Sequence, residues 1–185
     1  TSHNLGQNFA KAFDVKFQTK DNKEELVWAT SWGISTRLIG AVILTHGDDS
    51  GLRLPPKIAP IQIVFIPIFK NNDQKKAIKS YISPIVKSLK ENGIRLHEDW
   101  TDSSPGYKFN QWELKGVPIR VEVGPKDIDK NNVVFARRDV GEKMFISKED
   151  VLNESLKLLN DIQRGLFEQA KKFRDDNTHD VLNYE

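Results

Sequence analysis

The residues best suited to chemistry stand in the stretch Trp32–Ala41, where a strand pattern gives way to a helix pattern. Gly33 ends the strand pattern, and Ser35-Thr36-Arg37 opens the helix pattern. A guanidinium and two hydroxyls at such a junction suit a phosphate-bearing ligand, because helix N-terminal N–H groups and arginine both attract phosphate oxygens. The apolar neighbours of Arg37 predict partial desolvation, which strengthens its charge. On spacing alone, an ordinary surface arginine at a helix start is the more economical interpretation.

Two other groups have suggestive chemistry. His46 stands beside Asp48 and Asp49, but this spacing matches no standard zinc site. Trp112-Glu113-Leu114-Lys115 and Arg120 combine one carboxylate with cations. A guanine base offers N–H donors to a carboxylate and two acceptors to arginine or lysine. On residue types alone, the same residues fit the exposed end of a helix.

Composition sets broad limits on the function. The chain has 185 residues and a formal net charge of +2, which is compatible with an RNA partner without requiring one. The absence of cysteine excludes disulfides, thiol nucleophiles and cysteine zinc sites, and fits a cytosolic protein. The longest apolar stretch, Ala59–Phe69, is too short and too rich in proline to span a bilayer. Because Thr1 starts inside a motif, we expect a segment of a longer protein.

The first part of the chain predicts a hairpin followed by a helix. Phe9–Phe17 and Glu25–Trp32 are expected as strands on either side of a charged turn. Apolar residues at helical spacing predict a helix from Leu38 to near Gly47. The pair Pro55-Pro56 cannot continue a helix and marks a linker.

The second part predicts alternating strands and helices, which favours an α/β layer with a mostly parallel sheet. Strands are expected over 61–68, 94–96, 119–123, 133–138 and 143–146, and helices over 73–92 and 108–114. Pro84 should kink the first of these helices. Ser147 and Asp150 resemble a capping box at the start of a long final helix. Its apolar stripe is Leu152, Leu156, Leu159, Ile162 and Leu166.

The stretch Trp32–Ala41 also resembles motif 3 of class II aminoacyl-tRNA synthetases, in the form found in prolyl-tRNA synthetases of the eukaryotic and archaeal type. The resemblance covers nearly the whole chain. Its other motifs are Thr1-Ser2-His3-Asn4-Leu5-Gly6-Gln7-Asn8-Phe9, Ser104-Pro105-Gly106-Tyr107-Lys108-Phe109-Asn110, Trp112-Glu113-Leu114-Lys115-Gly116-Val117-Pro118-Ile119-Arg120 and Glu122-Val123-Gly124-Pro125-Lys126-Asp127.

The resemblance implies a fold in two parts. Residues 1–57 correspond to a strand–hairpin–helix remnant of the antiparallel class II catalytic domain. Residues 58–172 correspond to an α/β anticodon-binding domain, with a mixed five-stranded sheet flanked by three helices. Residues 173–185 would be a linker to an absent C-terminal domain, which often carries zinc in this subfamily.

The implied reaction joins proline to ATP as prolyl-adenylate and transfers the prolyl group to tRNA(Pro). Arg37 would be the catalytic residue and would bind ATP, with Mg²⁺ held through the ATP phosphates and no metal site on the protein. The other residues assigned to ATP are Ser35, Thr36, Thr1 and His46. The residues assigned to proline are His3, Trp28, Ser31, Trp32 and Gly33.

The resemblance also implies an anticodon-reading surface and a set of partners. Its residues would be Glu113, Arg120, Lys126, Arg138 and Lys143, with Arg137 on backbone phosphates. The parent protein would be a cytoplasmic homodimer without membrane contact. Because motifs 1 and 2 are missing, the segment alone is not expected to charge tRNA, and a non-catalytic anticodon-binding module is the alternative.

Overall fold

The computed structural model describes residues 1–180, which divide into two compact units. The first unit is Thr1–Ala41, and the second starts at Val42. No helix among the described residues is both long enough and apolar enough to cross a membrane.

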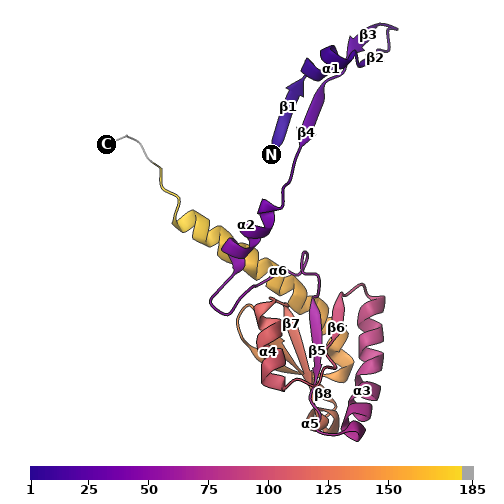
Figure 1. Cartoon of the computed structure of the whole chain (residues 1–185), viewed down its shortest axis with the longest axis vertical. Helices are drawn as coiled ribbons and strands as arrows, with labels where there is room; N and C mark the ends of the chain where they lie inside the picture. Colours follow the sequence, from indigo (N-terminus) through magenta and orange to yellow (C-terminus); the bar gives the residue numbers. More distant parts are fainter. Residues whose placement is uncertain (181–185) are drawn as a thin grey trace. The chain divides into compact units, whose positions relative to one another are not determined.

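The first unit is built from two short antiparallel ribbons and a helix (Figure 1). Strand β1 (Ser2–Gly6) pairs with β4 (Ala29–Trp32), and β2 (Lys16–Gln18) pairs with β3 (Glu24–Leu26). The strand predicted from Phe9 to Phe17 is wrong except at Lys16 and Phe17, because Asn8–Phe13 form helix α1 and a turn at Asp14 follows it. Phe9 and Phe13 stack at helical spacing, and Asp14 ends the helix in the left-handed conformation with φ of 50°.

This unit buries almost no apolar surface of its own. Among its hydrophobic side chains only Ala10 is buried, whereas Trp28 and Trp32 are 74% and 80% exposed. The predicted strand from Glu25 to Trp32 is split into β3 and β4. A two-stranded ribbon is at best marginally stable in water. Because this unit has almost no hydrophobic core, little else in it stabilises its two ribbons.

Helix α2 (Arg37–His46) confirms the helix predicted before Gly47. Its last turn closes with a bond from the Gly47 N–H to the Ile43 carbonyl at 2.7 Å. A Cβ at Gly47 would lie 2.6 Å from that oxygen, so a side chain there would force the turn apart.

The second unit is a mixed five-stranded sheet in the order β6-β5-β7-β8-β9, as the resemblance implied. The strands are β5 (Ile63–Pro67), β6 (Leu96–Glu98), β7 (Ile119–Val123), β8 (Asn132–Arg137) and β9 (Lys143–Ser147). Only β6, β5 and β7 are parallel, so the mostly parallel sheet expected from alternation is wrong for β8 and β9. The connections before β8 and β9 are too short for the crossover that a parallel pair needs.

Helices cover the two faces of this sheet unequally. Helices α3 (Asn72–Glu91) and α6 (Val151–Asp176) pack on the face that carries Ile63, Phe65 and Val121. Helix α4 (Pro105–Leu114) lies on the opposite face, where Trp112 packs against Val64 and Ile66 of β5. A fourth, short helix, α5 (Pro125–Asp129), joins β7 to β8. Figure 1 shows α3, α4, α5 and α6 around the strands.

Helix α6 starts and ends differently from the prediction. The Ser147 hydroxyl donates to the Glu149 carboxylate instead of capping, and a 3₁₀ turn (Lys148–Asp150) precedes the helix, so the capping box is wrong. Leu156 of the predicted stripe is 40% exposed. The buried side chains are Val151, Ser155, Leu158, Leu159, Ile162 and Leu166.

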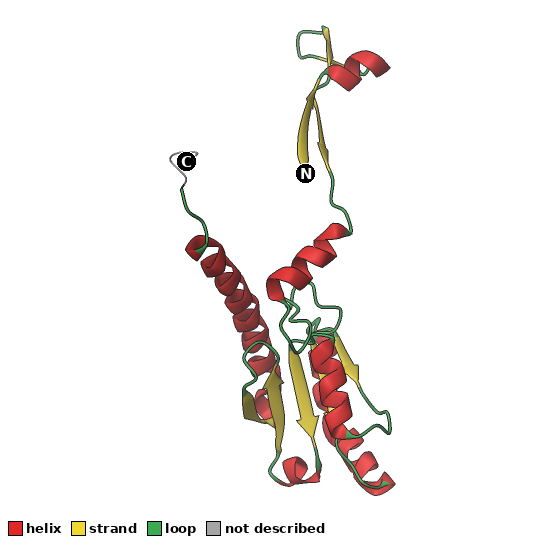
Figure 2. Ribbon diagram, turned by 60° about the vertical axis from the view of Figure 1, so that its left-hand side comes forward, coloured by secondary structure: helices red, strands yellow, loops and turns green. Residues whose placement is uncertain are grey.

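The C-terminal part of α6 extends past the sheet, as Figures 1 and 2 both show. Its buried residues end at Leu166, while Phe167 and Phe173 are exposed. The helix includes residues 173–176, which we assigned to the linker, and residues 181–185 of that segment lie outside the described residues.

A buried polar network fastens α4 to the loop after β6. The Asp99 carboxylate accepts a hydrogen bond from the Trp112 indole at 2.7 Å and lies 3.6 Å from the Lys108 ammonium. Lys108 also donates to the Asp99 carbonyl at 3.0 Å, and its side chain is only 3% exposed. Burial raises the pKa of Asp99, but hydrogen bonds from Thr101 and Trp112 outweigh it and lower that pKa below its usual value.

We predict that Asp99→Ala lowers the free energy of unfolding of the chain by about 3–5 kcal/mol, because the Lys108 charge remains buried without its partner. Urea unfolding measures the change, and Asp102→Ala, at an exposed position, is the control. Since the pKa of Asp99 is lower in the folded state, the stabilisation is present above the unfolded-state pKa and is lost as the pH falls through the folded-state pKa. Equal unfolding midpoints for both variants would contradict this role.

Candidate functional site

In the first unit, a hollow lies between the start of α2 and the segments that adjoin β1 and β4. The Thr1 nitrogen donates to the Gly33 carbonyl at 2.9 Å, and the Gly33 N–H donates to the Thr1 carbonyl at 3.0 Å. Thr1, Gly33, Ile34, Ser35, Arg37, Leu38 and Ala41 line the hollow. Three of the residues assigned to ATP, Thr1, Ser35 and Arg37, therefore surround one space. Its guanidinium, hydroxyls and apolar wall can hold a phosphate beside a planar group.

Thr36 is absent from this lining. Its carbonyl accepts the N–H of Ile39 at 3.0 Å, so its backbone forms part of the first turn of α2. Its hydroxyl makes no hydrogen bond within the described residues. The assignment of Thr36 to ATP stays a prediction.

The β1–β4 ribbon divides the residues assigned to proline between its two faces. His3 lies directly opposite Ser31, so their side chains share a face. Trp32 lies opposite Ser2 and is adjacent to Ser31 in sequence, which places it on the other face. Trp28 precedes β4 and lies near Gly6, where an added Cβ would be 3.8 Å from its ring. Gly33 closes the ribbon against Thr1.

His46 belongs to the second unit and lines a different hollow from Arg37. Arg53 donates to the His46 carbonyl at 2.8 Å. Burial, together with the charge of Arg53, lowers the pKa of His46 and so favours its neutral imidazole. Within residues 1–180, no group of three or more histidine, cysteine, aspartate or glutamate side chains could hold a metal ion.

Three residues assigned to the anticodon line one hollow of the second unit. These are Glu113 at the end of α4, Arg120 on β7 and Arg138 just after β8. The rest of the lining is Trp112, Val117, Ala136, Arg137 and Gly141. A carboxylate and cations at one hollow suit the edge of a guanine base.

The donors of Arg138 are largely used inside the protein. Its Nε donates to the Glu113 carbonyl at 3.1 Å, and its two terminal nitrogens donate to the Asp48 carboxylate at 2.9 and 2.5 Å. Arg137 is likewise paired, through two hydrogen bonds to Asp139 at 3.0 and 2.7 Å. In this arrangement both arginines shape the hollow rather than present free donors to it.

The Asp48–Arg138 pair is one end of a strap that runs along the end of α4. The Leu52 N–H donates to the Leu114 carbonyl at 3.0 Å, and the Leu54 N–H donates to the Gly116 carbonyl at 3.2 Å. Gly51 has φ of 125°, and a Cβ there would lie 2.6 Å from the Leu114 backbone. Gly116 has φ of 71° and would make an equally close contact with Leu52. The strap, residues 48–54, therefore depends on glycine at both points.

Sequence reasoning missed Glu122, which connects the two cations on the sheet. Arg120 donates to the Glu122 carboxylate through two nitrogens at 3.1 Å, and the Lys143 ammonium lies 3.0 Å from the same oxygen. The Arg120 guanidinium lies 4.3 Å from the ring centre of Phe109 on α4, and the Lys143 ammonium lies 5.4 Å from it. The alternation in Ile119-Arg120-Val121-Glu122-Val123 was the available signal, because it places Arg120 and Glu122 on one face.

Lys126 is not brought to this hollow. It is exposed and lines a separate one with Phe69, Lys70 and Gln74, beyond the other end of β7. Arg120 stands at the beginning of β7 and Val123 at its end, so the length of the strand separates Lys126 from the rest of the set.

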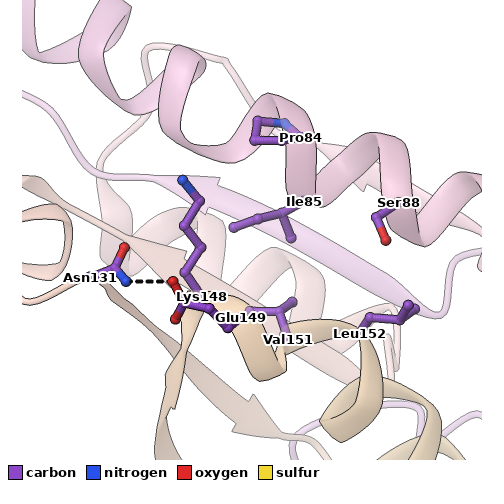
Figure 3. A pocket seen from close by; sticks show the side chains of 8 residues that line it. All are labelled: Pro84, Ile85, Ser88, Asn131, Lys148, Glu149, Val151 and Leu152. Atoms are coloured by element: carbon purple, nitrogen blue, oxygen red, sulfur yellow. Dashed lines mark hydrogen bonds between the residues drawn. The ribbon is translucent and has the colours of Figure 1, made fainter.

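A further hollow lies between α3 and the start of α6 and contains none of the predicted site residues (Figure 3). Pro84, Ile85 and Ser88 come from α3. Asn131 donates to Glu149 at 2.8 Å across from them, as the dashed line in Figure 3 marks. We assign no ligand to this hollow.

Comparison with known proteins decides the family. Residues 62–158, more than half of the chain, match the family model described as "Anticodon binding domain". The chain belongs to this family. The match begins just before β5, ends within α6 and includes Glu113, Arg120, Glu122, Arg138 and Lys143.

The whole chain is also homologous to proline–tRNA ligases. It is 50% identical over 187 residues to the enzyme of Chlorobium phaeobacteroides (strain BS1) and 49% identical over 189 residues to that of Chloroflexus aurantiacus (strain ATCC 29366 / DSM 635 / J-10-fl). It is 46% identical over 183 residues to the enzyme of Symbiobacterium thermophilum. These alignments cover 99–100% of this chain and 37–39% of each relative. The chain therefore spans about two fifths of the length of these bacterial relatives.

We predict that Asp48→Asn lowers the free energy of unfolding by about 1 kcal/mol, because the exchange removes the charge that Arg138 binds. Asp49→Asn is the matched control, since Asp49 is the exposed neighbour. Hydrogen bonding to Arg138 lowers the pKa of Asp48, so the difference between wild type and variant should fade as the pH falls through that pKa. A difference that persists unchanged in acid would refute the charge pairing.

Proposed function

We propose that this chain is the motif 3 and anticodon-binding part of a proline–tRNA ligase. In the proposed reaction, proline and ATP form prolyl-adenylate, and the prolyl group is then transferred to tRNA(Pro). The observation that carries the proposal is the similarity to proline–tRNA ligases over the full chain at 46–50% identity. The match to an anticodon-binding domain supports the tRNA half of the reaction.

The hollow around Arg37 is the proposed ATP site. In-line attack of the proline carboxylate on the α-phosphate needs little more than correct placement and stabilisation of the charge that develops. Arg37 suits this role because a guanidinium stays charged, binds two phosphate oxygens together and stacks on a purine. Thr1 and Ser35 lie beside it and can donate hydroxyl hydrogen bonds. Thr36 and His46 remain in the proposed ATP set on the resemblance alone.

Proline would be recognised at the β1–β4 ribbon. A small apolar ring must be selected by shape, because it offers few hydrogen-bonding groups. Trp28 and Trp32 provide exposed aromatic surface, while His3 and Ser31 share the other face with respect to Trp32. We assign the proline ring to the exposed aromatic surface of Trp28 and Trp32, and His3, Ser31 and Gly33 remain in the proposed proline set on the resemblance alone.

Arg120, Glu113 and Lys143 are the proposed readers of the anticodon. Proline anticodons share two consecutive guanines, whose edges need both a carboxylate and cations. Glu113 and Arg120 line one hollow, and Glu122 holds Arg120 and Lys143 together. Arg138, paired with Asp48, and Arg137, paired with Asp139, would support this surface, and Lys126 would contact the RNA backbone.

Several finer assignments belong to the same proposal. Mg²⁺ would be bound through the ATP phosphates. A homodimeric parent, a cytoplasmic location and the eukaryotic and archaeal subtype of motif 3 rest on the resemblance.

A non-catalytic anticodon-binding module is the second candidate. The second unit has its own core and contains the whole match to the anticodon-binding family, whereas the first unit has almost no core. Binding of tRNA(Pro) without adenylate formation in the complete protein would favour this function.

We predict that Arg37→Ala abolishes proline-dependent ATP–pyrophosphate exchange in the complete ligase that contains this chain. Loss of the guanidinium removes charge stabilisation at the phosphate. Arg164→Ala is the control, because Arg164 is exposed on α6 and pairs only with Asp161 among the described residues. Exchange that survives in Arg37→Ala would refute the assigned role.

We predict that Arg120→Ala and Glu113→Ala each weaken tRNA(Pro) charging about 5- to 150-fold, since one base contact contributes about 1–3 kcal/mol. Adenylate formation should stay nearly unchanged. Lys126→Ala, at the other end of β7, should reduce charging less and equally for all anticodon sequences. Joint loss of charging and adenylate formation would indicate misfolding or a wrong site.

A further inference from the structure

Phe145 is an exposed aromatic side chain in the middle of a strand that otherwise packs well. It is 71% exposed, while its neighbours Met144 and Ile146 face the core with α6. Because side chains alternate along β9, Phe145 shares its face with Lys143. This is the α4 face of the sheet, since Lys143 and Arg120 both lie over Phe109 of α4.

The register places Phe145 beside the proposed anticodon readers. One row across the sheet is Arg120, Ala136 and Lys143, and the adjacent row is Glu122, Val134 and Phe145. Adjacent strands are about 4.8 Å apart, so Phe145 lies roughly 10 Å across the sheet from Glu122. Neighbouring nucleotides of one RNA loop can reach both rows.

The surroundings of Phe145 favour a nucleobase over an apolar protein partner. Val134 and Ala136 belong to β8, which lies between β7 and β9. Both are buried and add little exposed apolar surface beside Phe145. The nearest exposed group in the adjacent row is the Lys143 ammonium, whose side chain is 50% exposed and which can meet a phosphate. An isolated aromatic ring beside cations is the arrangement on which single-stranded RNA bases stack.

We propose that Phe145 stacks on an unpaired base of the tRNA anticodon loop, next to the bases read by Glu113, Arg120 and Lys143. The proposal rests on the proposed function and extends it to a residue outside the predicted set. Because every base has a π face, Phe145 contributes affinity without reading sequence. Arg120 and Glu113 supply the base discrimination.

Binding of the complete chain to a tRNA(Pro) anticodon stem-loop tests this. Phe145→Ala should weaken binding about 5- to 150-fold, the range found for stacked bases. Phe145→Tyr should retain affinity and Phe145→Leu should not, since stacking requires an aromatic ring. The matched control is Phe167→Ala, at an exposed phenylalanine of α6 that is 60% exposed. Circular dichroism melting confirms that each variant is folded.

Binding to stem-loops in which one nucleotide lacks its base identifies the base that stacks on Phe145. The effect of Phe145→Ala should disappear for one loop position and persist for the others. Equal loss with every abasic loop, or full recovery with leucine, would overturn stacking. Unchanged RNA affinity together with loss of self-association would also overturn it and assign the face to a second copy of the chain.

The two proposals fail in different ways. Wild-type binding by Phe145→Ala, with binding lost in Arg120→Ala, overturns stacking and leaves the proposed function intact. Failure of the wild-type chain to bind the tRNA(Pro) stem-loop overturns both.

Discussion

The second unit depends on how α4 is held against one half of its sheet. The buried Asp99 carboxylate receives Trp112 and faces Lys108, so two residues of α4 are tied to the loop after β6. Trp112 then covers Val64 and Ile66, while Phe109 reaches toward β7. Arg120 and Lys143 lie over the Phe109 ring on the same face, so the position of α4 also determines where these cations stand. A shift of α4 would move Phe109 and Glu113 together.

Local patterns predicted the elements well where apolar residues recur at strand or helix spacing. Strand β7 was predicted at its observed bounds, and β5, β8, β9 and α3 within two residues. The errors fall where the structure depends on distant partners or on a few local bonds. Helix α1 is short, and the rings of Phe9 and Phe13 stack along it. The Ser147 hydroxyl donates a hydrogen bond to Glu149 instead of capping helix α6.

The candidate site residues also differ in how far their roles can be predicted from sequence. A residue type indicates what chemistry is available, and only the fold indicates which donors are already used. Arg120 and Arg138 look equivalent in sequence, yet Arg138 is held by Asp48, and Arg120 shares Glu122 with Lys143. Glu122 could have been identified from alternation in β7. The separation of Lys126 follows from the bounds of β7, since Arg120 stands near the beginning of that strand and Lys126 beyond its end.

The strap 48–54 has a consequence for how this segment can vary among homologues. Surface loops usually accept insertions, because their backbone is solvated and unconstrained. Here two backbone hydrogen bonds, an ion pair and two glycines in tight contact fix the spacing between Asp48 and Leu54. Lengthening it by one residue would shift Gly51 away from Leu114 and place a side chain in that contact. Homologues should therefore vary in sequence along this segment while keeping its length constant.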